Sequence, residues 1–296
     1  MKTARTLASC CAFGLPLLLS GCFLISTTRK LPVPKNAIVE TATPDQLVEQ
    51  LNQRWAALDN MTTKVDIHAS VLKASTGEDT TYTTVSGNIV FSKPNKLRVL
   101  GRTPVIGVKI FDLASDGKSF TLYIPQKKIA IKGLNTLTKK SAIWYENIRP
   151  DFFTNALAVR GLEPDEYYSV TSDSETVEDA AKKHLYFVQE YVLSITRHIP
   201  GSHRDKPVRV ITFRRDSLLP SGQDLYDAEG NLETQVTYSD YRDFGFGMYP
   251  STIVIKRPLD NLQIVLTTVT VNKNIDMPAD QFALTVPDET QIKNLE

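Results

Sequence analysis

Hydrophobic residues recur along the chain with two different periods, and the first of these is helical. Thr43, Pro44 and Gln46 form a helix start with a capping residue, a proline in the first turn and a capping-box partner. The apolar residues that follow share one helical face: Leu47, Val48, Leu51, Trp55 and Leu58. This pattern predicts an amphipathic helix that covers another apolar surface.

From Val65 the period changes to two, and the segments become rich in valine, isoleucine, threonine, tyrosine and phenylalanine. Turns at 93–95, 116–117 and 125–126 are short, which predicts an antiparallel meander with one apolar face and one polar face. The residues predicted to share a face within each strand are Ile89 with Phe91, Leu97 with Val99, Val108 with Ile110, Phe120 with Leu122 and Ile124, and Ile129 with Ile131.

A second helix interrupts the strands between residues 141 and 161. Pro150 suits its start and Gly161 its end, and its apolar side chains are Phe152, Phe153, Ala156 and Leu157. Strands then resume at about 167–170, 184–196, 208–214, 223–226, 232–241, 252–256 and 262–272. The pattern predicts one largely antiparallel sheet with two helical additions, and it shows no repeat of fixed period.

The N-terminus has the features of an export signal. Lys2 and Arg5 precede an apolar run over 7–19 that is too short to span a bilayer but suits the hydrophobic part of a signal peptide. The run ends in Leu-Ser-Gly before Cys22, which resembles the lipobox of bacterial lipoproteins. That resemblance implies that Cys22 is acylated and becomes the new N-terminus; ordinary signal cleavage and a buried apolar helix are the alternatives.

Cysteine usage agrees with a lipid anchor. Cys10 and Cys11 lie within the leader, so Cys22 is the only cysteine of the mature chain and no intramolecular disulfide can form. Two or three acyl chains, at about 0.8 kcal/mol per buried methylene group, hold a protein on a membrane essentially permanently. Phe23 follows the cysteine, and by resemblance to enterobacterial lipoproteins the lack of aspartate there implies the periplasmic face of the outer membrane.

Composition and charge fit one folded body. The 296 residues are 42% hydrophobic and 23% charged, enough for a sizeable core. Removal of Lys2 and Arg5 with the leader leaves 32 basic against 33 acidic residues, so we expect no nucleic-acid partner. The predicted divisions are a signal peptide at 1–21, an acylated tether at 22–42, a single domain at 43–290 and a tail at 291–296.

The sequence lacks the usual signatures of catalysis and of metal binding. His68, His184, His198 and His203 do not form a His-Glu-x-x-His motif, and nucleophile-elbow and phosphate-loop motifs are missing. The sequence therefore predicts no catalytic residues, no metal ligands and no cofactor.

Two groups of residues leave other possibilities open. Carboxylates cluster at 163–166, at 173–179 and at 240–243, where solvated loops explain them better than a glycosidase pair. An aromatic group is suited to stacking on a sugar, although packing around a glycine-bearing hairpin explains it with less assumption. This group consists of Tyr238, Tyr241, Phe244, Phe246 and Tyr249.

The order of elements resembles the LolA and LolB lipoprotein-localisation superfamily over roughly residues 43–288. Individual segments resemble it as well, at 87–91, 97–100, 103–107, 108–113, 249–253, 271–272 and 282–287. The resemblance implies an α+β, mainly β fold, in which a curved antiparallel half-open β-barrel surrounds an apolar cavity covered by the two helices. Acyl chains of a lipid or lipoprotein enter such a cavity, and an apolar loop helps to deliver cargo into the membrane.

This resemblance leads to specific site predictions. Val105 and Ile106, between Pro104 and Gly107, are predicted to form the membrane or cargo loop, with burial against the helices as the alternative. The predicted cavity wall consists of Ile89, Phe91, Leu97, Val99, Val108, Ile110, Phe120, Leu122, Phe152, Phe153 and Leu157. The alternative to an open cavity is an interior in which these residues pack against one another.

The predicted function is that of a noncatalytic, outer-membrane-anchored lipoprotein that binds acyl chains as an acceptor or chaperone. The anchor makes LolB-like proteins, rather than soluble LolA-like shuttles, the closer comparison. One alternative is a structural or assembly lipoprotein that binds an envelope protein partner and has no lipid ligand. A further alternative is a lipid-modifying or glycan-cleaving hydrolase.

Overall fold

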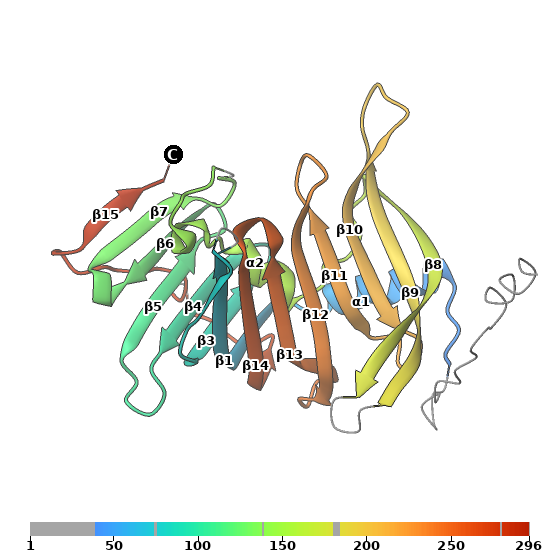
Figure 1. Ribbon diagram of the computed structural model, residues 1–296, viewed down its shortest axis with the longest axis horizontal. Coiled ribbons are helices and arrows are strands. Elements are labelled where there is room, and N and C mark those ends of the chain that lie inside the picture. The colour runs from blue at the N-terminus through green and yellow to red at the C-terminus, as the bar shows by residue number, and fades with distance from the viewer. Residues whose placement is uncertain (1–38, 74–75, 138, 180–183, 279, 296) are drawn as a thin grey trace, which may run out of the picture.

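One continuous curved sheet dominates the computed structural model, which describes residues 39–295 apart from 74–75, 138, 180–183 and 279 (Figure 1). The predicted signal peptide, Cys22 and most of the predicted tether lie outside the described residues. In the described part of the chain, no helix combines the length and apolar character that a membrane crossing requires.

The sheet begins as the predicted meander. Its first strands are β1 (Asn60–Lys73), β2 (Glu78–Thr81), β3 (Val85–Ser92), β4 (Lys96–Arg102), β5 (Lys109–Ser115), β6 (Ser119–Ile124) and β7 (Ile129–Leu134). From β3 to β7 each strand pairs antiparallel with the next. Short 3-10 helices add η1 (Pro125–Lys127) at the β6–β7 turn and η2 (Trp144–Asn147) after β7.

The second half of the sheet is also a meander. It consists of β8 (Glu166–Asp179), β9 (His184–His198), β10 (Asp205–Arg214), β11 (Pro220–Tyr226), β12 (Leu232–Asp243), β13 (Met248–Arg257) and β14 (Leu262–Lys273), with η3 (Pro258–Asp260) between the last two. Pairing of β1 with β14 joins the halves, so the order runs β15-β7-β6-β5-β4-β3-β1-β14-β13-β12-β11-β10-β9-β8, with β2 paired to β1.

The C-terminal residues differ from the prediction of a tail. Residues Gln291–Asn294 form β15, which pairs parallel with β7 and places Gln291 opposite Ile129. The pairing gives the backbone of β7 hydrogen-bond partners on an edge that would otherwise be open. Four residues are too few to show a period in the sequence, which is why the strand was not predicted.

The first helix, α1 (Pro44–Ala56), has the predicted capping box. The Thr43 side chain accepts a hydrogen bond from the Gln46 amide, and the Gln46 side chain accepts one from the Thr43 amide. Its buried residues, Leu47, Val48 and Leu51, pack against β9 and β10, and each such side chain contributes about 1.5–3 kcal/mol when fully buried. The strand residues in this cluster are Tyr191, Leu193, Ile195, Ile211 and Phe213.

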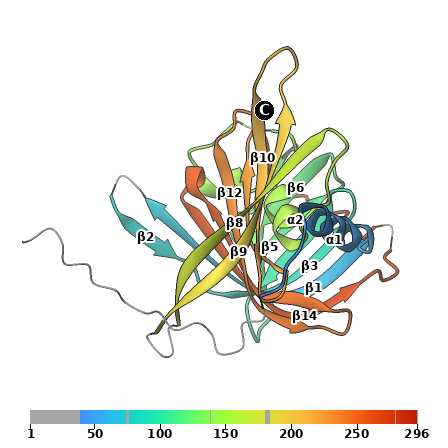
Figure 2. The same ribbon diagram turned by 90° about the vertical axis from the view of Figure 1, so that its right-hand side faces the viewer.

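The second helix, α2 (Asp151–Leu157), lies on the same concave face as α1 (Figure 2). It ends at Leu157, so the prediction that Gly161 closes it is wrong. Gly161 instead allows a close approach to α1, since a Cβ atom there would lie 2.8 Å from Asn52 Oδ1. The two helices and the curved sheet confirm the predicted fold class.

Candidate functional site

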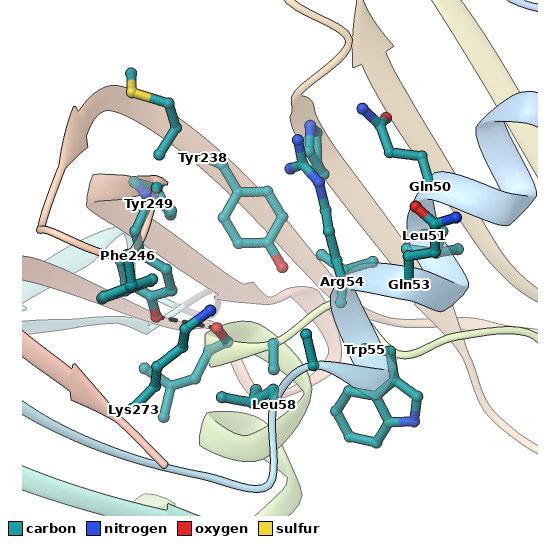
Figure 3. Close-up of a pocket in the computed structure, with 18 of the residues that line it drawn as sticks. Gln50, Leu51, Gln53, Arg54, Trp55, Leu58, Tyr238, Phe246, Tyr249 and Lys273 are labelled. Carbon is teal, nitrogen blue, oxygen red and sulfur yellow. Dashed lines mark hydrogen bonds between the residues drawn. The ribbon is translucent and has the colours of Figure 1, made fainter. Parts of the chain in front are cut away.

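A cavity of about 450 Å³ lies between the C-terminal half of α1, the segment after α2 and the β12–β13 hairpin (Figure 3). Its volume falls within the range of roughly 300–1,000 Å³ that is typical of small-molecule sites. Much of its wall is apolar, from Leu51, Trp55, Leu58, Met61, Leu157 and Phe246. A cavity of this size and lining suits a hydrocarbon chain better than a polar metabolite.

Three tyrosines from β12 and β13 form one wall of this cavity. The Tyr241 hydroxyl donates to the Pro220 carbonyl at 2.7 Å, and the Tyr249 hydroxyl donates to the Leu157 carbonyl at 2.9 Å. The Tyr238 hydroxyl has no hydrogen-bond partner among the described residues, although Tyr238 is only 5% exposed. Burial raises the pKa of all three phenols, so each remains a hydrogen-bond donor at neutral pH.

The tyrosines reach the same cavity because of a local change in backbone direction. Asp240 lies between Tyr238 and Tyr241 and has a φ of +54°, a value that interrupts the regular alternation of side chains along a strand. Both tyrosines therefore line the cavity despite their odd spacing.

Two cations lie at the cavity, Arg54 from α1 and Lys273 from β14. The Lys273 ammonium group lies 4.9 Å from the centre of the Phe246 ring. Within the described part of the chain, neither cation forms an ion pair, and the residues that line the cavity include no carboxylate. The lining therefore carries net positive charge beside its apolar surface.

A buried ion cluster fixes the segment that follows α2. Arg209 of β10 is 1% exposed, donates to the carbonyl of Gly161 at 2.6 Å and pairs with Glu166 at 3.2 Å. Arg160 pairs with the other carboxylate oxygen of Glu166 at 2.7 Å. Burial lowers the pKa of Arg209 to about 10, so the guanidinium stays charged at pH 7. The cluster holds the chain that carries Ala158, a cavity residue, against the sheet.

Few polar contacts attach α1 to its surroundings. The Leu162 amide donates to Asn52 Oδ1 at 2.8 Å, and the Tyr168 hydroxyl donates to Asp45 at 2.5 Å. Lys93 donates to the Trp55 carbonyl, and its ammonium group lies 4.5 Å from the centre of the Trp55 ring. The attachment of α1 to the sheet therefore rests mainly on its buried apolar face.

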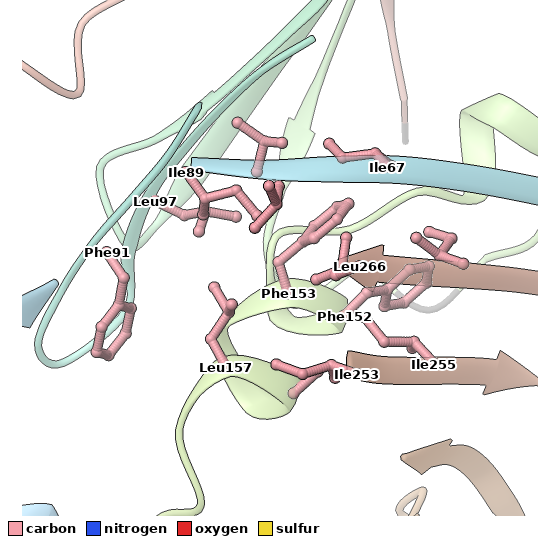
Figure 4. Close-up of a cluster of buried hydrophobic side chains, with 14 of the residues drawn as sticks. Ile67, Ile89, Phe91, Leu97, Phe152, Phe153, Leu157, Ile253, Ile255 and Leu266 are labelled. Atoms are coloured by element: carbon pink, nitrogen blue, oxygen red, sulfur yellow. The ribbon is translucent and has the colours of Figure 1, made fainter. Parts of the chain in front are cut away.

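Most residues predicted for the cavity wall lie elsewhere. Leu157 lines the cavity, but eight of the others are at most 3% exposed within a packed cluster around α2 (Figure 4). These eight are Ile89, Phe91, Leu97, Val99, Phe120, Leu122, Phe152 and Phe153. For these eight residues the predicted alternative holds: they pack against one another, and two of them, Phe152 and Phe153, are supplied by α2 itself.

Val108 and Ile110, also predicted for the cavity wall, belong neither to the cavity lining nor to the buried cluster. Val108 precedes β5 and is 53% exposed, and Ile110 is partly buried. The pairing of Gly101 with Phe111 and of Val99 with Leu113 places Phe111 and Leu113 on the inner face. The prediction that Ile110 faces the cavity is therefore wrong, because the inner face of β5 carries the odd-numbered residues Phe111 and Leu113. Side chains alternate along a strand, so an error of one residue places each of them on the opposite face.

The loop between β4 and β5 exposes the two predicted apolar residues. Val105 is fully exposed and Ile106 is 80% exposed, which contradicts the alternative of burial against the helices. Thr103 closes the loop, since its carbonyl accepts from Gly107 at 3.1 Å and its hydroxyl accepts from the Val108 amide at 3.0 Å. Val105 has a φ of +67°, an uncommon and strained value for a β-branched residue.

Sequence reasoning missed the residues that line the open cavity. It assigned Tyr238, Tyr241, Phe246 and Tyr249 to packing, whereas all four line the cavity. Two of them also contact each other, since the Phe246 and Tyr249 ring centres lie 6.3 Å apart. The sequence feature that could have indicated this site is the group of aromatic residues around the glycine-bearing hairpin.

The acidic clusters are of two kinds. Glu166, predicted to lie in a solvated loop, is 6% exposed and belongs to the ion cluster, whereas its neighbour Asp165 has a side chain that is 64% exposed. Among the residues that the structure describes, no three histidine, cysteine, aspartate or glutamate side chains gather as a metal site would require.

No protein-family model matches this chain, and no curated protein matches it. Solved structures are similar to it. A LolA superfamily protein from Nitrosomonas europaea is 14% identical, with a TM-score of 0.48, and the likeness covers 82% of this chain and 99% of that one. The fold resembles the LolA-like fold. A DUF1329 family protein from Desulfovibrio piger is 14% identical, with a TM-score of 0.49, over 81% of this chain and 95% of that one.

A third solved structure is also similar to this chain. It is a domain from Vibrio parahaemolyticus described as an outer membrane lipoprotein-sorting protein, 10% identical with a TM-score of 0.43, over 81% of this chain and 94% of that one. These likenesses concern the fold alone, and the function of this chain is proposed below from its own residues.

Asp151, at the start of α2, makes stability depend on pH. Its Oδ1 atom is buried without a hydrogen-bond partner among the described residues, and burial, followed by the charge of Glu233, raises its pKa to about 6. As the pH rises from about 4 to 6, the unfolded chain releases this proton while the folded chain retains it. The folded state therefore loses stability across this window, and above pH 6 the loss is complete.

Asp151→Asn is accordingly expected to stabilise the protein at neutral pH. We expect its free energy of unfolding to exceed the wild-type value by roughly 3 kcal/mol at about pH 7.5 and to differ little at about pH 4. Urea unfolding followed by circular dichroism at the two pH values measures this difference. A gain of equal size at both pH values would contradict the role of the carboxyl proton.

Proposed function

We propose that this chain is a noncatalytic envelope lipoprotein that binds acyl chains of lipids or lipoproteins beneath α1. The observation that carries the proposal is the cavity itself, about 450 Å³ with an aliphatic and aromatic wall. At about 25 cal/mol for each Å² of apolar surface removed from water, a long acyl chain gains enough there to leave solvent without covalent chemistry. Movement of α1 away from β9 and β10 would open the entrance.

The proposal includes attachment to a membrane. Acylation of Cys22 anchors the chain at the periplasmic face of the outer membrane, and the residues between it and α1 form the tether. This arrangement favours a role as acceptor or chaperone for acyl chains on one bilayer, as in LolB-like proteins. The β4–β5 loop supports contact with that bilayer, because two exposed apolar side chains at its tip can enter the lipid interface.

Replacing Val105 and Ile106 together with glutamate tests the role of this loop. Both side chains are exposed, so we expect the melting temperature to change by no more than a few degrees, while transfer of acyl cargo to vesicles slows roughly tenfold or more. Transfer of a fluorescent acyl lipid from the protein to liposomes measures the rate. Serine at both positions is the matched control for loss of apolar surface without added charge; an unchanged glutamate variant would exclude the loop from delivery.

One observation favours the alternative of an envelope protein partner. Strand β8 forms the end of the sheet and pairs only with β9 among the described strands, and Tyr167 at its start is 61% exposed. A long edge strand of this kind can accept a strand from another protein. Under this alternative the cavity holds no lipid.

Copurification separates the two functions. The mature chain with Cys22→Ser lacks an acyl group of its own, so any lipid found with it by native mass spectrometry and organic extraction is a ligand. We expect a bound acyl lipid at up to one per chain. A ligand-free protein that also binds no added acyl lipid would favour the partner-binding alternative.

A further inference from the structure

We propose that the cavity selects an amphiphile with an anionic head group, which the Tyr238 hydroxyl and the cations Arg54 and Lys273 bind. This inference rests on the proposed function and specifies its ligand: an acyl chain that ends in a carboxylate or a phosphate. Both head groups offer negatively charged oxygen acceptors, and a neutral lipid does not.

The hydroxyl groups of the three cavity tyrosines differ in their hydrogen bonding. Tyr241 and Tyr249 each donate to a backbone carbonyl, whereas Tyr238, although buried, donates to no described group. Leaving a buried donor unpaired costs about 1–3 kcal/mol, so native proteins rarely keep one without a purpose. A ligand oxygen placed at Tyr238 would supply the missing acceptor.

The two cations at the cavity have no anionic partner among the described residues. Arg54 and Lys273 both line the cavity, form no ion pair in the described structure and have no carboxylate beside them in the lining. Arg209 and Arg257, which are buried, are by contrast ion-paired, Arg209 with Glu166 and Arg257 with Asp260. An anionic amphiphile suits this lining, because its charged end can bind the two unpaired cations and its hydrocarbon chain can contact the apolar surface.

The polar groups come from separate elements that meet at the cavity. Figure 3 shows Tyr238 and Lys273 directed from β12 and β14 toward the space between α1 and the hairpin, with Arg54 extending from α1 beside Tyr238. Gln50 of α1 adds a buried Oε1 atom that also has no partner among the described residues. A side-chain amide offers a donor or an acceptor according to which end faces the ligand.

The position of these groups indicates how the ligand lies. The apolar residues Leu51, Met61 and Leu157 line the cavity and lie away from solvent, so this part of the lining suits the hydrocarbon chain rather than the charged end. Arg54 is exposed and Lys273 is half-buried, so a head group bound to them stays near solvent. Removal of α1 from the sheet would separate Arg54 from Tyr238 and release the head group.

Ligand preference tests this assignment. Palmitate, 1-palmitoyl lysophosphatidic acid and 1-hexadecanol have similar chains and differ in the head group, and the protein is the mature chain with Cys22→Ser. We expect the wild type to bind one or both anionic ligands at least about tenfold more tightly than hexadecanol, measured by isothermal titration calorimetry. The stronger of the two anions identifies carboxylate or phosphate as the natural head group.

Tyr238→Phe, Arg54→Gln and Lys273→Gln each remove one proposed contact. Each variant should weaken binding of the preferred anion about five- to tenfold and leave hexadecanol binding within twofold of the wild type. Tyr238→Phe removes an unpaired hydroxyl, so its melting temperature without ligand should be equal to or above that of the wild type. Lys256→Gln, at an exposed residue of β13, is the matched control and should change no affinity.

The possible failures are distinguishable. If hexadecanol binds as tightly as both anions and the three variants bind all ligands equally, the head-group site is wrong while the proposed acyl-binding cavity stands. If no ligand with a sixteen-carbon chain binds, both the head-group site and the proposed function are wrong.

Discussion

Ala158→Trp should abolish acyl-chain binding in a protein that still folds. Ala158 follows α2, is partly buried and lines the cavity, so an indole at this position would occupy the space intended for hydrocarbon. Losing contact with only three methylene groups, at about 0.8 kcal/mol each, weakens binding about 50-fold. We therefore expect the affinity for palmitate to fall by at least that factor in isothermal titration calorimetry.

Stability must be measured in parallel, because overpacking also destabilises proteins. An added indole that does not fit costs about 1–3 kcal/mol, whereas one that enters an existing cavity costs little. Val269→Trp, at a position of β14 that is 56% exposed, is the matched control for adding a tryptophan and should leave affinity unchanged. Normal palmitate binding by a folded Ala158→Trp protein would show that the ligand lies elsewhere.

Arg209→Met is expected to produce the largest loss of stability. The substitution leaves Glu166 buried with one of its partners removed and takes the donor away from the Gly161 carbonyl. Breaking a buried pair on one side typically costs 3–5 kcal/mol, so urea unfolding should show a decrease of about 4 kcal/mol. Because Arg209 holds the segment next to the cavity, we also expect weaker acyl binding at temperatures where the variant is folded.

The double variant Arg209→Met with Glu166→Leu separates the charge effect from packing. Replacing both members of a buried ion pair with apolar residues is often nearly neutral, so the double variant should recover at least half of the lost stability. A double variant as unstable as Arg209→Met alone would indicate that shape and backbone hydrogen bonding, rather than the uncompensated charge of Glu166, dominate at this site.

Local patterns in the sequence predicted the elements of the fold well. The capping box at Thr43 and Gln46 is a contact between residues three positions apart, so the sequence contains all of the information needed for the start of α1. Strands β9 to β14 likewise follow their apolar periods. The later part of β8 is polar and acidic, and it becomes a strand only because β9 provides a backbone partner, so the prediction of 167–170 was too short.

Local sequence patterns could not predict where on the inner face of the sheet the cavity lies. Strand periodicity identifies an inner face but does not show which part of that face a helix fills. Phe152 and Phe153 of α2 are buried in one cluster with the inner residues of β3 and β4, whereas the region near Tyr238, where α1 and α2 end, stays open. That outcome depends on how two helices pack across a sheet, a long-range property that a single sequence does not display.

The side chains with the strongest functional indications were missed for the same reason. Tyr238 has the sequence environment of an ordinary strand tyrosine, and only the structure shows that its hydroxyl lacks the carbonyl partner that Tyr241 and Tyr249 have. Arg54 and Lys273 are separated by more than two hundred residues and meet only through the pairing of β1 with β14 and the position of α1.

Photocrosslinking tests the central claim, that hydrocarbon lies beneath α1, most directly. A palmitate analogue with a diazirine near the end of its chain would be bound to the mature Cys22→Ser chain, irradiated and located by peptide mass spectrometry. The cavity predicts adducts within residues 50–61, 157–159 and 238–250, lost in Ala158→Trp and displaced by unlabelled palmitate. Adducts confined to other segments, or unchanged by Ala158→Trp, would contradict it.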